Sequence, residues 1–129
     1  MQPLRHVLCI DDEPDILEVA RLSLETVGGL RVSCLNDTTQ AIEHIRTIAP
    51  DLLLVDVMMP HMDGPAILAA LRAHPTLAHL PVVFMTARVQ PAEMAKYREL
   101  GATGVIAKPF DPMELSQEVQ RIWETVHDA

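Results

Sequence analysis

Short apolar runs alternate with longer segments of helical periodicity along the chain, and this alternation restricts the folds that the chain can adopt. The strand-sized runs are residues 6–10, 30–35, 51–56, 80–87 and 103–108. Because these runs are apolar throughout and do not alternate with polar residues, they are typical of strands covered on both faces.

The segments between these runs have the spacing of amphipathic helices. In residues 14–27, apolar side chains recur every three or four positions until Gly28 and Gly29 end the pattern. Further helices are predicted from a cap at Asn36 or Asp37 to just before Pro50, and over residues 65–73, 91–100 and 112–127. Helices between consecutive strands produce a parallel sheet with right-handed crossovers. The order therefore predicts one doubly wound α/β domain that spans residues 1–129.

The composition excludes several classes of protein. The formal net charge is −8 over 129 residues, which argues against a domain that binds nucleic acid through its own charge. The apolar run at residues 7–10 is too short for a secretory signal, and no apolar run is long enough to span a membrane. We therefore expect a cytoplasmic protein without membrane insertion or direct nucleic-acid binding. Cys9 and Cys34 both fall in apolar segments, which favours buried, reduced thiols and leaves a disulfide open.

Polar residues stand where the predicted strands end. Asp11 and Asp12 follow the first strand, Asp56 ends the third, Thr86 ends the fourth and Lys108 ends the fifth. Because ligands of parallel α/β sheets bind beyond the carboxyl ends of the strands, these side chains should converge on one rim. Several carboxylates there suit Mg²⁺, while an ammonium and a hydroxyl suit a phosphoryl group. A carboxylate in the middle makes an aspartyl phosphate plausible.

Four segments, taken in order, resemble a known family. "CIDDEP", "LLLVDVMMPHMDG", "VVFMTA" and "GVIAKPF" are similar to the marks of the receiver domain of two-component response regulators, the CheY-like proteins. The resemblance covers essentially the full length. It implies a flavodoxin-like (βα)5 sandwich with strand order 2-1-3-4-5, helices on both faces, and a single receiver domain over residues 1–129.

The resemblance also implies roles for individual residues. Asp56 would be the phosphoacceptor, Lys108 would pair with the phosphoryl group, and Thr86 would move toward it after phosphorylation. The Lys108–Pro109 bond corresponds to a cis peptide of the family. Four groups would hold Mg²⁺: Asp11, Asp12, Asp56 and the backbone carbonyl of Met58. Asp12 would bind the ion directly and Asp11 through a water molecule.

A receiver domain is a signalling switch and not a turnover enzyme for an external substrate. The resemblance implies that a sensor histidine kinase or a histidine phosphotransfer protein supplies the phosphoryl group. Phosphorylation would then change a surface on the fourth helix, fifth strand and fifth helix, which a downstream protein reads. Pro14, Ile16 and Leu17, at the start of the first helix, would offer a surface to a helical phosphodonor.

One position departs from the family pattern. Three residues before Lys108, where receivers usually carry Tyr or Phe, this chain has Val105. The fourth helix and its loop must then transmit the movement of Thr86 by another packing change. Arg88 and Met58 occupy positions that tune phosphoryl lifetime in the family, and Ala87 is small, as donor access requires.

Several of these residues also have ordinary structural interpretations. Asp11 and Asp12 could cap the first helix, since acids favour a helix N-terminus. Glu13 is expected to face solvent, and Asp63 is expected to shape the turn before Gly64. The six histidines lack paired ligand spacing and are expected at the surface or in loops, and a single tryptophan is expected at the margin of the last helix: Trp123.

Two other functions fit part of the pattern. A magnesium-dependent phosphatase with an aspartyl nucleophile usually places a second acid two residues beyond the nucleophile, where this chain has Met58. A docking module with a relic site would not need the intact set of Asp12, Asp56, Thr86 and Lys108.

Overall fold

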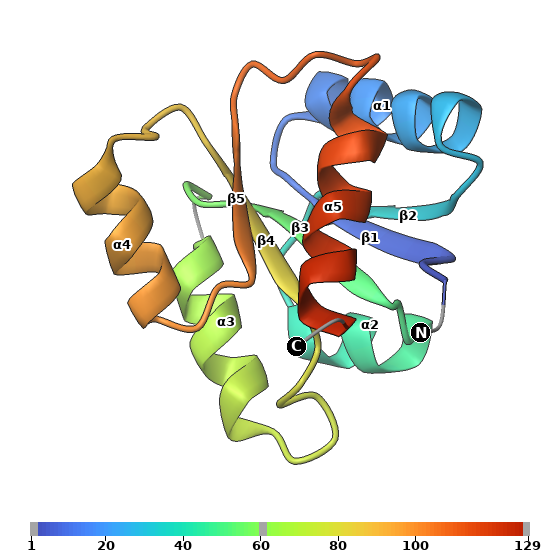
Figure 1. The fold of residues 1–129 in the computed structure, drawn as a ribbon. Coiled ribbons are helices and arrows are strands. Elements are labelled where there is room, and N and C mark those ends of the chain that lie inside the picture. Colours follow the sequence, from blue (N-terminus) through green and yellow to red (C-terminus); the bar gives the residue numbers. More distant parts are fainter. Residues whose placement is uncertain (1–2, 60–61, 128–129) are drawn as a thin grey trace.

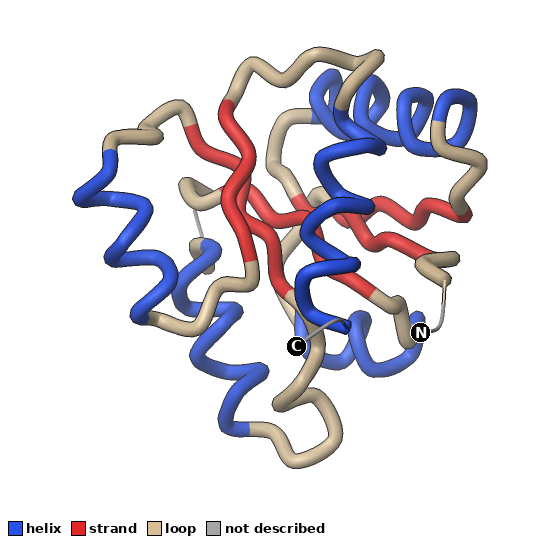
Figure 2. The backbone as a smooth tube through the Cα atoms, in the orientation of Figure 1, coloured by secondary structure: helices blue, strands red, loops and turns tan. Residues whose placement is uncertain are grey.

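The computed structural model describes residues 3–59 and 62–127, and within them it contains one five-stranded parallel sheet. The strands are β1 (His6–Ile10), β2 (Arg31–Leu35), β3 (Leu52–Asp56), β4 (Val82–Thr86) and β5 (Gly104–Ala107). Their order across the sheet is β2-β1-β3-β4-β5, and every neighbouring pair is parallel. Figures 1 and 2 show the sheet at the centre of the molecule. The predicted doubly wound fold and its strand order are confirmed.

Helices cover both faces of this sheet. They are α1 (Pro14–Leu22), continued by the π-helical turn η1 (Ser23–Val27), then α2 (Ala41–Ile48), α3 (Gly64–Ala73), α4 (Pro91–Glu99) and α5 (Leu115–His127). One buried cluster joins α1, η1 and α5 to the sheet, and the other joins α2, α3 and α4 to it. The described residues include no helix that is long and apolar enough to cross a membrane.

The two clusters explain why the strand sequences are apolar throughout. Successive side chains of a strand point to opposite faces. In β1, Val7 and Cys9 belong to the cluster under α1 and α5, while Leu8 and Ile10 belong to the cluster under α2, α3 and α4. A central strand therefore needs an apolar residue at every position. Edge strand β2 differs, because all of its residues are partly or largely exposed.

The helix ends follow local backbone chemistry. Gly28 caps η1 and Gly29 has a φ of 66°, so the glycine pair ends the first helix as predicted. The second helix begins later than predicted, because Asp37 accepts a hydrogen bond from the backbone N–H of Thr39 in a turn. Its N-cap is Gln40, in the left-handed region with a φ of 60°.

Three side chains lie elsewhere than predicted. Trp123 is only 6% exposed and packs in the core under α5, not at its margin. Cys34 is exposed, because β2 is an edge strand, whereas Cys9 is buried as expected. His6 lies in β1, partly buried, where its imidazole shares a hydrogen bond of 2.8 Å with the Ser33 hydroxyl.

Candidate functional site

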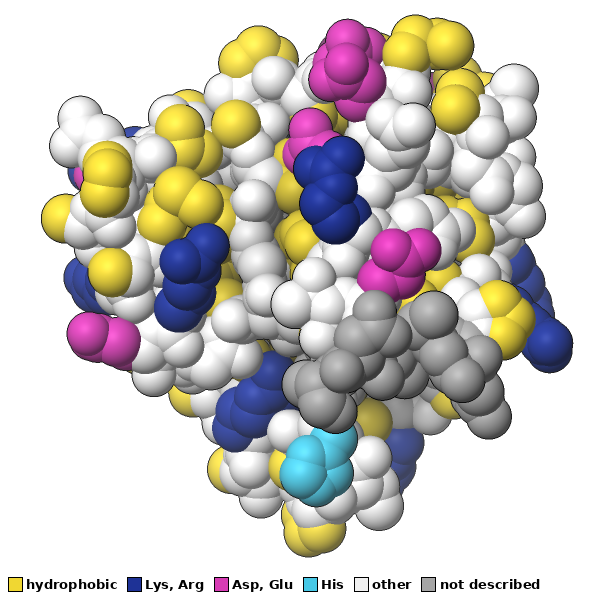
Figure 3. Space-filling model, in the orientation of Figure 1, with side chains coloured by type: hydrophobic (Ala, Val, Ile, Leu, Met, Phe, Trp, Pro, Cys, Tyr) yellow, Lys and Arg dark blue, Asp and Glu magenta, His cyan; other side chains and the backbone are white. Residues whose placement is uncertain are grey.

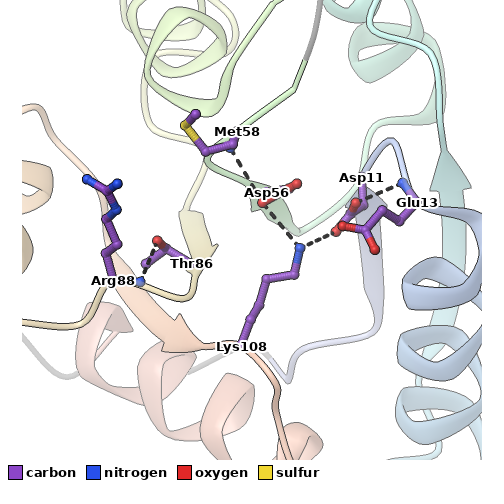
Figure 4. Close-up of polar contacts among 7 residues, drawn as sticks. All are labelled: Asp11, Glu13, Asp56, Met58, Thr86, Arg88 and Lys108. Atoms are coloured by element: carbon purple, nitrogen blue, oxygen red, sulfur yellow. Dashed lines mark hydrogen bonds and ion pairs between the residues drawn. The ribbon is translucent and has the colours of Figure 1, made fainter.

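The carboxyl ends of the strands form one rim that carries the predicted polar side chains. Asp11 and Asp12 follow β1, Asp56 and Thr86 end β3 and β4, and Lys108 follows β5. Figure 4 shows Asp11, Asp56, Thr86 and Lys108 at this rim. A cleft of about 570 Å³ opens at this rim and reaches toward α4. It is lined by strand-end residues and by residues of α4: Asp12, Glu13, Asp56, Val57, Met58, Thr86, Ala87, Arg88, Glu93, Lys96, Tyr97 and Lys108.

Lys108 connects two of the acids. Its Nζ lies 3.0 Å from Oδ2 of Asp11 and 3.3 Å from Oδ1 of Asp56. Asp11 has no exposed surface, and Asp56 and Lys108 are mostly buried. Figure 4 shows the ammonium between the two carboxylates. Ion pairs of this kind are much less screened by salt than surface pairs.

The electrostatics leave the site short of positive charge. Burial raises the pKa of Asp56, and the neighbouring Asp11 carboxylate raises it further, while Lys108 and the backbone N–H of Met58 only partly offset this. Burial opposes the charge of Lys108, but the carboxylates of Asp11 and Asp56 outweigh it and raise the pKa of the ammonium. Two acids therefore compete for one lysine, and a further cation would relieve them.

The acids are also close enough to share a metal ion. Asp11, Asp12 and Asp56 each offer a carboxylate oxygen, and these oxygens all lie within 4.8 Å of one another. Mg²⁺ takes oxygen ligands at about 2.0–2.1 Å in an octahedron, so opposite ligands are about 4 Å apart. The spacing and the chemistry of these three carboxylates therefore fit such an ion.

The acids differ in how many hydrogen bonds their carboxylates already accept from the protein. Oδ1 of Asp11 accepts a hydrogen bond of 2.9 Å from the backbone N–H of Glu13, and Oδ2 accepts one from Nζ of Lys108. Asp12 is exposed and lines the cleft. A metal in the cleft would reach Asp12 without displacing a protein hydrogen bond, whereas it would have to compete for Asp11.

The structural interpretation of these acids as helix caps holds only in part. The N-cap of α1 is Glu13, whose own side chain makes no capping hydrogen bond, while the Asp11 carboxylate accepts the backbone N–H of this N-cap residue. By contrast, Asp63 does serve as the N-cap of α3, where it accepts a 2.9 Å hydrogen bond from the Ala66 N–H. Glu13 is exposed as expected, although it also lines the cleft.

Thr86 and Met58 flank Asp56 in the cleft. The Thr86 hydroxyl is buried and accepts a 3.0 Å hydrogen bond from the backbone N–H of Arg88, so it is engaged by its own loop. The Met58 N–H lies 3.5 Å from Oδ1 of Asp56, and the Met58 side chain is 76% exposed. The Lys108–Pro109 peptide bond is cis, as predicted.

The sequence did not reveal that α4 contributes to the cleft. Tyr97 is the only buried residue of this polar helix, and its ring stands edge-on against Phe84 of β4, with centroids 5.3 Å apart. Phe84 pairs in register with Val105, the position that lacks the usual aromatic residue. The sequence feature that could have indicated this contact is Tyr97 itself, a single aromatic residue within a polar helix.

Comparison with known proteins agrees with this geometry. The profile of the response regulator receiver domain matches residues 7–120. The chain belongs to the response regulator receiver family. It is 34% identical over 116 residues to response regulator Rre1 of Synechocystis sp. and 32% identical to the DNA-binding response regulator MtrA of Mycolicibacterium smegmatis. These matches cover 90% of this chain but only 50% and 49% of the relatives, so the chain spans about half of their length.

Solved receiver structures share the fold. The chemotaxis response regulator CheY4 of Vibrio cholerae superposes with a TM-score of 0.84 at 28% identity, covering 92% of this chain and 98% of that one. The receiver domain of a signal transduction histidine kinase from Syntrophus aciditrophicus superposes with a TM-score of 0.81 at 29% identity, covering 97% and 94%. This chain is thus a receiver domain of two-component signalling, a family of phosphorylation-dependent switches.

The raised pKa of Asp56 predicts a stability difference that depends on pH. The folded site favours the protonated carboxyl over the charged one. Ionisation of Asp56 therefore lowers the free energy of unfolding above the folded pKa, and it has no such effect below the ordinary pKa of 3.8. Asp56→Asn should therefore unfold at a higher urea concentration than the wild type at pH 7 with a chelator present. The difference should shrink as the pH falls toward 3.8. A variant that is less stable at pH 7, or a difference that does not change with pH, would contradict this.

Proposed function

We propose that Asp56 is the phosphoryl acceptor of this receiver domain and that the reaction requires Mg²⁺. The observation that supports this most is the convergence of Asp56, Lys108 and the acids after β1 at one cleft. Both protein contacts of Asp56 engage Oδ1, so Oδ2 has no protein partner among the described residues. Oδ2 is therefore the oxygen best placed to attack.

In this proposal a carboxylate oxygen of Asp56 attacks phosphorus in line. A phosphorus–oxygen bond forms as the bond to the donor breaks, and a histidine donor recovers its ring nitrogen, which takes a proton from solvent. Lys108 lies 3.3 Å from the carboxylate and would turn to a phosphoryl oxygen. A bound Mg²⁺, held by Asp11, Asp12, Asp56 and the Met58 carbonyl, would offset the charge of the phosphoryl oxygens.

The partner that supplies the phosphoryl group is proposed to be a sensor histidine kinase or a histidine phosphotransfer protein, in the cytoplasm. Exposed residues at the start of α1 beside the cleft, Pro14 and the partly exposed Ile16, would contact a helical donor. Leu17, which was expected to contribute, is only 7% exposed and packs in the core. A net charge of −8 supports a protein as the downstream target and argues against nucleic acid.

We further propose that residues 1–129 act as one receiver unit that switches and does not turn over an external substrate. The two buried clusters on one sheet support a single unit. The position where aspartyl phosphatases carry a second acid holds the exposed Met58, which cannot donate a proton.

The surface that changes is proposed to lie on the side of α4, β5 and α5. Thr86 would leave the Arg88 N–H for a phosphoryl oxygen, and the loop before α4 would move with it. Tyr97 and Thr86 line the same cleft, and Tyr97 is held by Phe84 on β4. Hydrophobic side chains are exposed near both ends of α4, at Val89 and Leu100, and Figure 3 shows hydrophobic surface over this helix.

The phosphoacceptor assignment predicts where a small phosphodonor reacts. Wild-type protein incubated with acetyl phosphate and Mg²⁺ should gain one phosphoryl group, whereas Asp56→Asn should gain none. Asp15→Asn, which removes an exposed acid of α1, should react like the wild type. Intact-mass spectrometry measures all three. An adduct on Asp56→Asn, or none on the wild type with either acetyl phosphate or a phosphohistidine protein, would refute the assignment.

The metal assignment predicts that two neighbouring acids differ. Asp12→Asn should weaken Mg²⁺ binding about 10-fold or more, because it removes a direct ligand. Glu13→Gln should leave the affinity nearly unchanged, although Glu13 also lines the cleft. Isothermal titration calorimetry on the unphosphorylated proteins would show the difference, and equal losses in the two variants would contradict the ligand set.

The role of α4 predicts that Tyr97 separates phosphorylation from its structural response. Tyr97→Leu should accept a phosphoryl group at the wild-type rate but lose the phosphorylation-dependent change in deuterium uptake across residues 88–100. Tyr97→Phe keeps the ring that packs against Phe84 and should respond as the wild type does. If the leucine variant responds fully, the signal reaches the surface by another route.

A further inference from the structure

Two cysteines face each other on neighbouring strands, and the phosphoryl site does not use them. Cys9 of β1 and Cys34 of β2 are directly opposite in the parallel register. Residues opposite each other in this way point to the same face of the sheet. The two thiols interact, and their interaction raises the pKa of Cys9 and lowers the pKa of Cys34. The sulfurs are therefore neighbours in the folded protein.

The strand spacing suits a covalent bond between them. Adjacent strands lie about 4.7–4.9 Å apart, and disulfides span Cα separations of about 4.4–6.8 Å. A bond between Cys9 and Cys34 would thus need rotation of the side chains but no large movement of the backbone. It would join central strand β1 to edge strand β2.

The two cysteines differ in access to solvent. Cys9 has no exposed surface and lies among the residues under α1 and α5. Cys34 is exposed on the edge strand, and its Sγ lies 3.9 Å from the backbone oxygen of Leu17 in α1. A dissolved oxidant therefore reaches Cys34 directly, whereas Cys9 is shielded from solvent.

The surroundings of Cys34 favour its reactive form. The neighbouring Cys9 thiol lowers the pKa of Cys34 most, and the Arg21 guanidinium lowers it further. Burial and the carboxylates of Glu18 and Glu25 oppose these effects, but the pKa of the Cys34 thiol is lowered overall. The thiolate is the nucleophilic form of cysteine, so this thiol reacts more readily than an unperturbed one.

We propose that Cys9 and Cys34 form an oxidisable dithiol, which a hydroperoxide converts to an intramolecular disulfide between β1 and β2. The Cys34 sulfur attacks a peroxide oxygen, so that a sulfur–oxygen bond forms, the oxygen–oxygen bond breaks, and the leaving oxygen takes a proton from solvent as an alcohol or water. The Cys9 sulfur then attacks the Cys34 sulfur, and water leaves with the Cys9 proton. The two sulfurs together lose two electrons, which reduce the peroxide.

This site is independent of the proposed phosphoryl transfer, but it adjoins the rim that carries it. Just beyond the cysteine pair, the N–H of Asp11, two residues after Cys9, donates to the carbonyl of Leu35, one residue after Cys34, at 3.2 Å. The disulfide would therefore tether the two strands next to the hydrogen bond that fixes Asp11. The disulfide would give the domain a second input, by oxidation. This input acts at the edge of β1 that pairs with β2, whereas β3 pairs with the other edge.

The test uses the reduced wild-type protein and hydrogen peroxide. After treatment, the protein is unfolded in the presence of a maleimide and its intact mass is measured. The wild type should lose two hydrogens, bind no maleimide and remain monomeric on a non-reducing gel. Peptide mapping should then find Cys9 joined to Cys34. A reductant should restore both maleimide sites.

Two variants separate the roles of the thiols. With peroxide and dimedone present, Cys9→Ala should accumulate a dimedone adduct on Cys34, because no second thiol resolves the sulfenic acid. Cys34→Ala should keep Cys9 available to maleimide, because Cys9 is buried. Circular dichroism confirms that each variant is folded before it is used.

Three results would overturn the proposal. The wild type could retain both free thiols at peroxide concentrations that label Cys34 in Cys9→Ala. The oxidised wild type could contain only disulfides between molecules. Cys34→Ala could lose its remaining thiol as fast as the wild type does. The second result, like the peptide mapping, needs only the wild type, so the test stays decisive even if a variant fails to fold.

Discussion

The contact of Lys108 with Asp11 and Asp56 joins three strand ends, and the proposed chemistry of the cleft depends on it. The lysine follows β5, at one edge of the sheet, and lies 97 residues from Asp11 in the sequence. It reaches past the end of β4 to the acids of β1 and β3. Because the sheet is parallel, all these ends lie on one rim, where a single ammonium meets both carboxylates. The fold and the site are in this sense one arrangement.

That arrangement is electrostatically incomplete. One lysine neutralises part of the charge of two mostly buried acids, and the pKa of Asp56 stays raised despite the ion pair. A buried site with an excess of negative charge is costly unless a cation joins it. The same excess makes the site receptive to a divalent cation, and a phosphoryl group would bring oxygens for that cation and for Lys108 to bind. The electrostatic cost of this cluster of acids and the proposed reactivity of Asp56 therefore have one cause.

The sequence allowed prediction of those features that follow from strand order and strand ends. Asp56 and Lys108 could be placed on one rim because each stands at the carboxyl end of an apolar run, and the carboxyl ends of parallel strands lie at the same edge of the sheet. The exposure of Cys34 could not be predicted from the apolar pattern, because it depends on which strand lies at the edge. Trp123 was misplaced because it sits one residue after the apolar stripe of α5, yet its large ring still reaches the core. Tyr97 was missed because the rotation of a polar helix is set by contacts with the sheet and not by its own periodicity.

The position of Tyr97 bears on how a receiver domain without the usual aromatic residue on its fifth strand can transmit a signal. Val105 is too small to fill and vacate the space beside Thr86 as a rotating ring would. The ring instead comes from α4, where it meets Phe84, the residue paired with Val105. An aromatic side chain on a strand moves by rotating about its own bonds. Tyr97 is the single buried residue of α4, so a displacement of its ring can move the helix as well. In this chain the aromatic contact and the proposed moving surface both involve α4, so in this proposal a shift at Thr86 need not pass through β5 to reach α4.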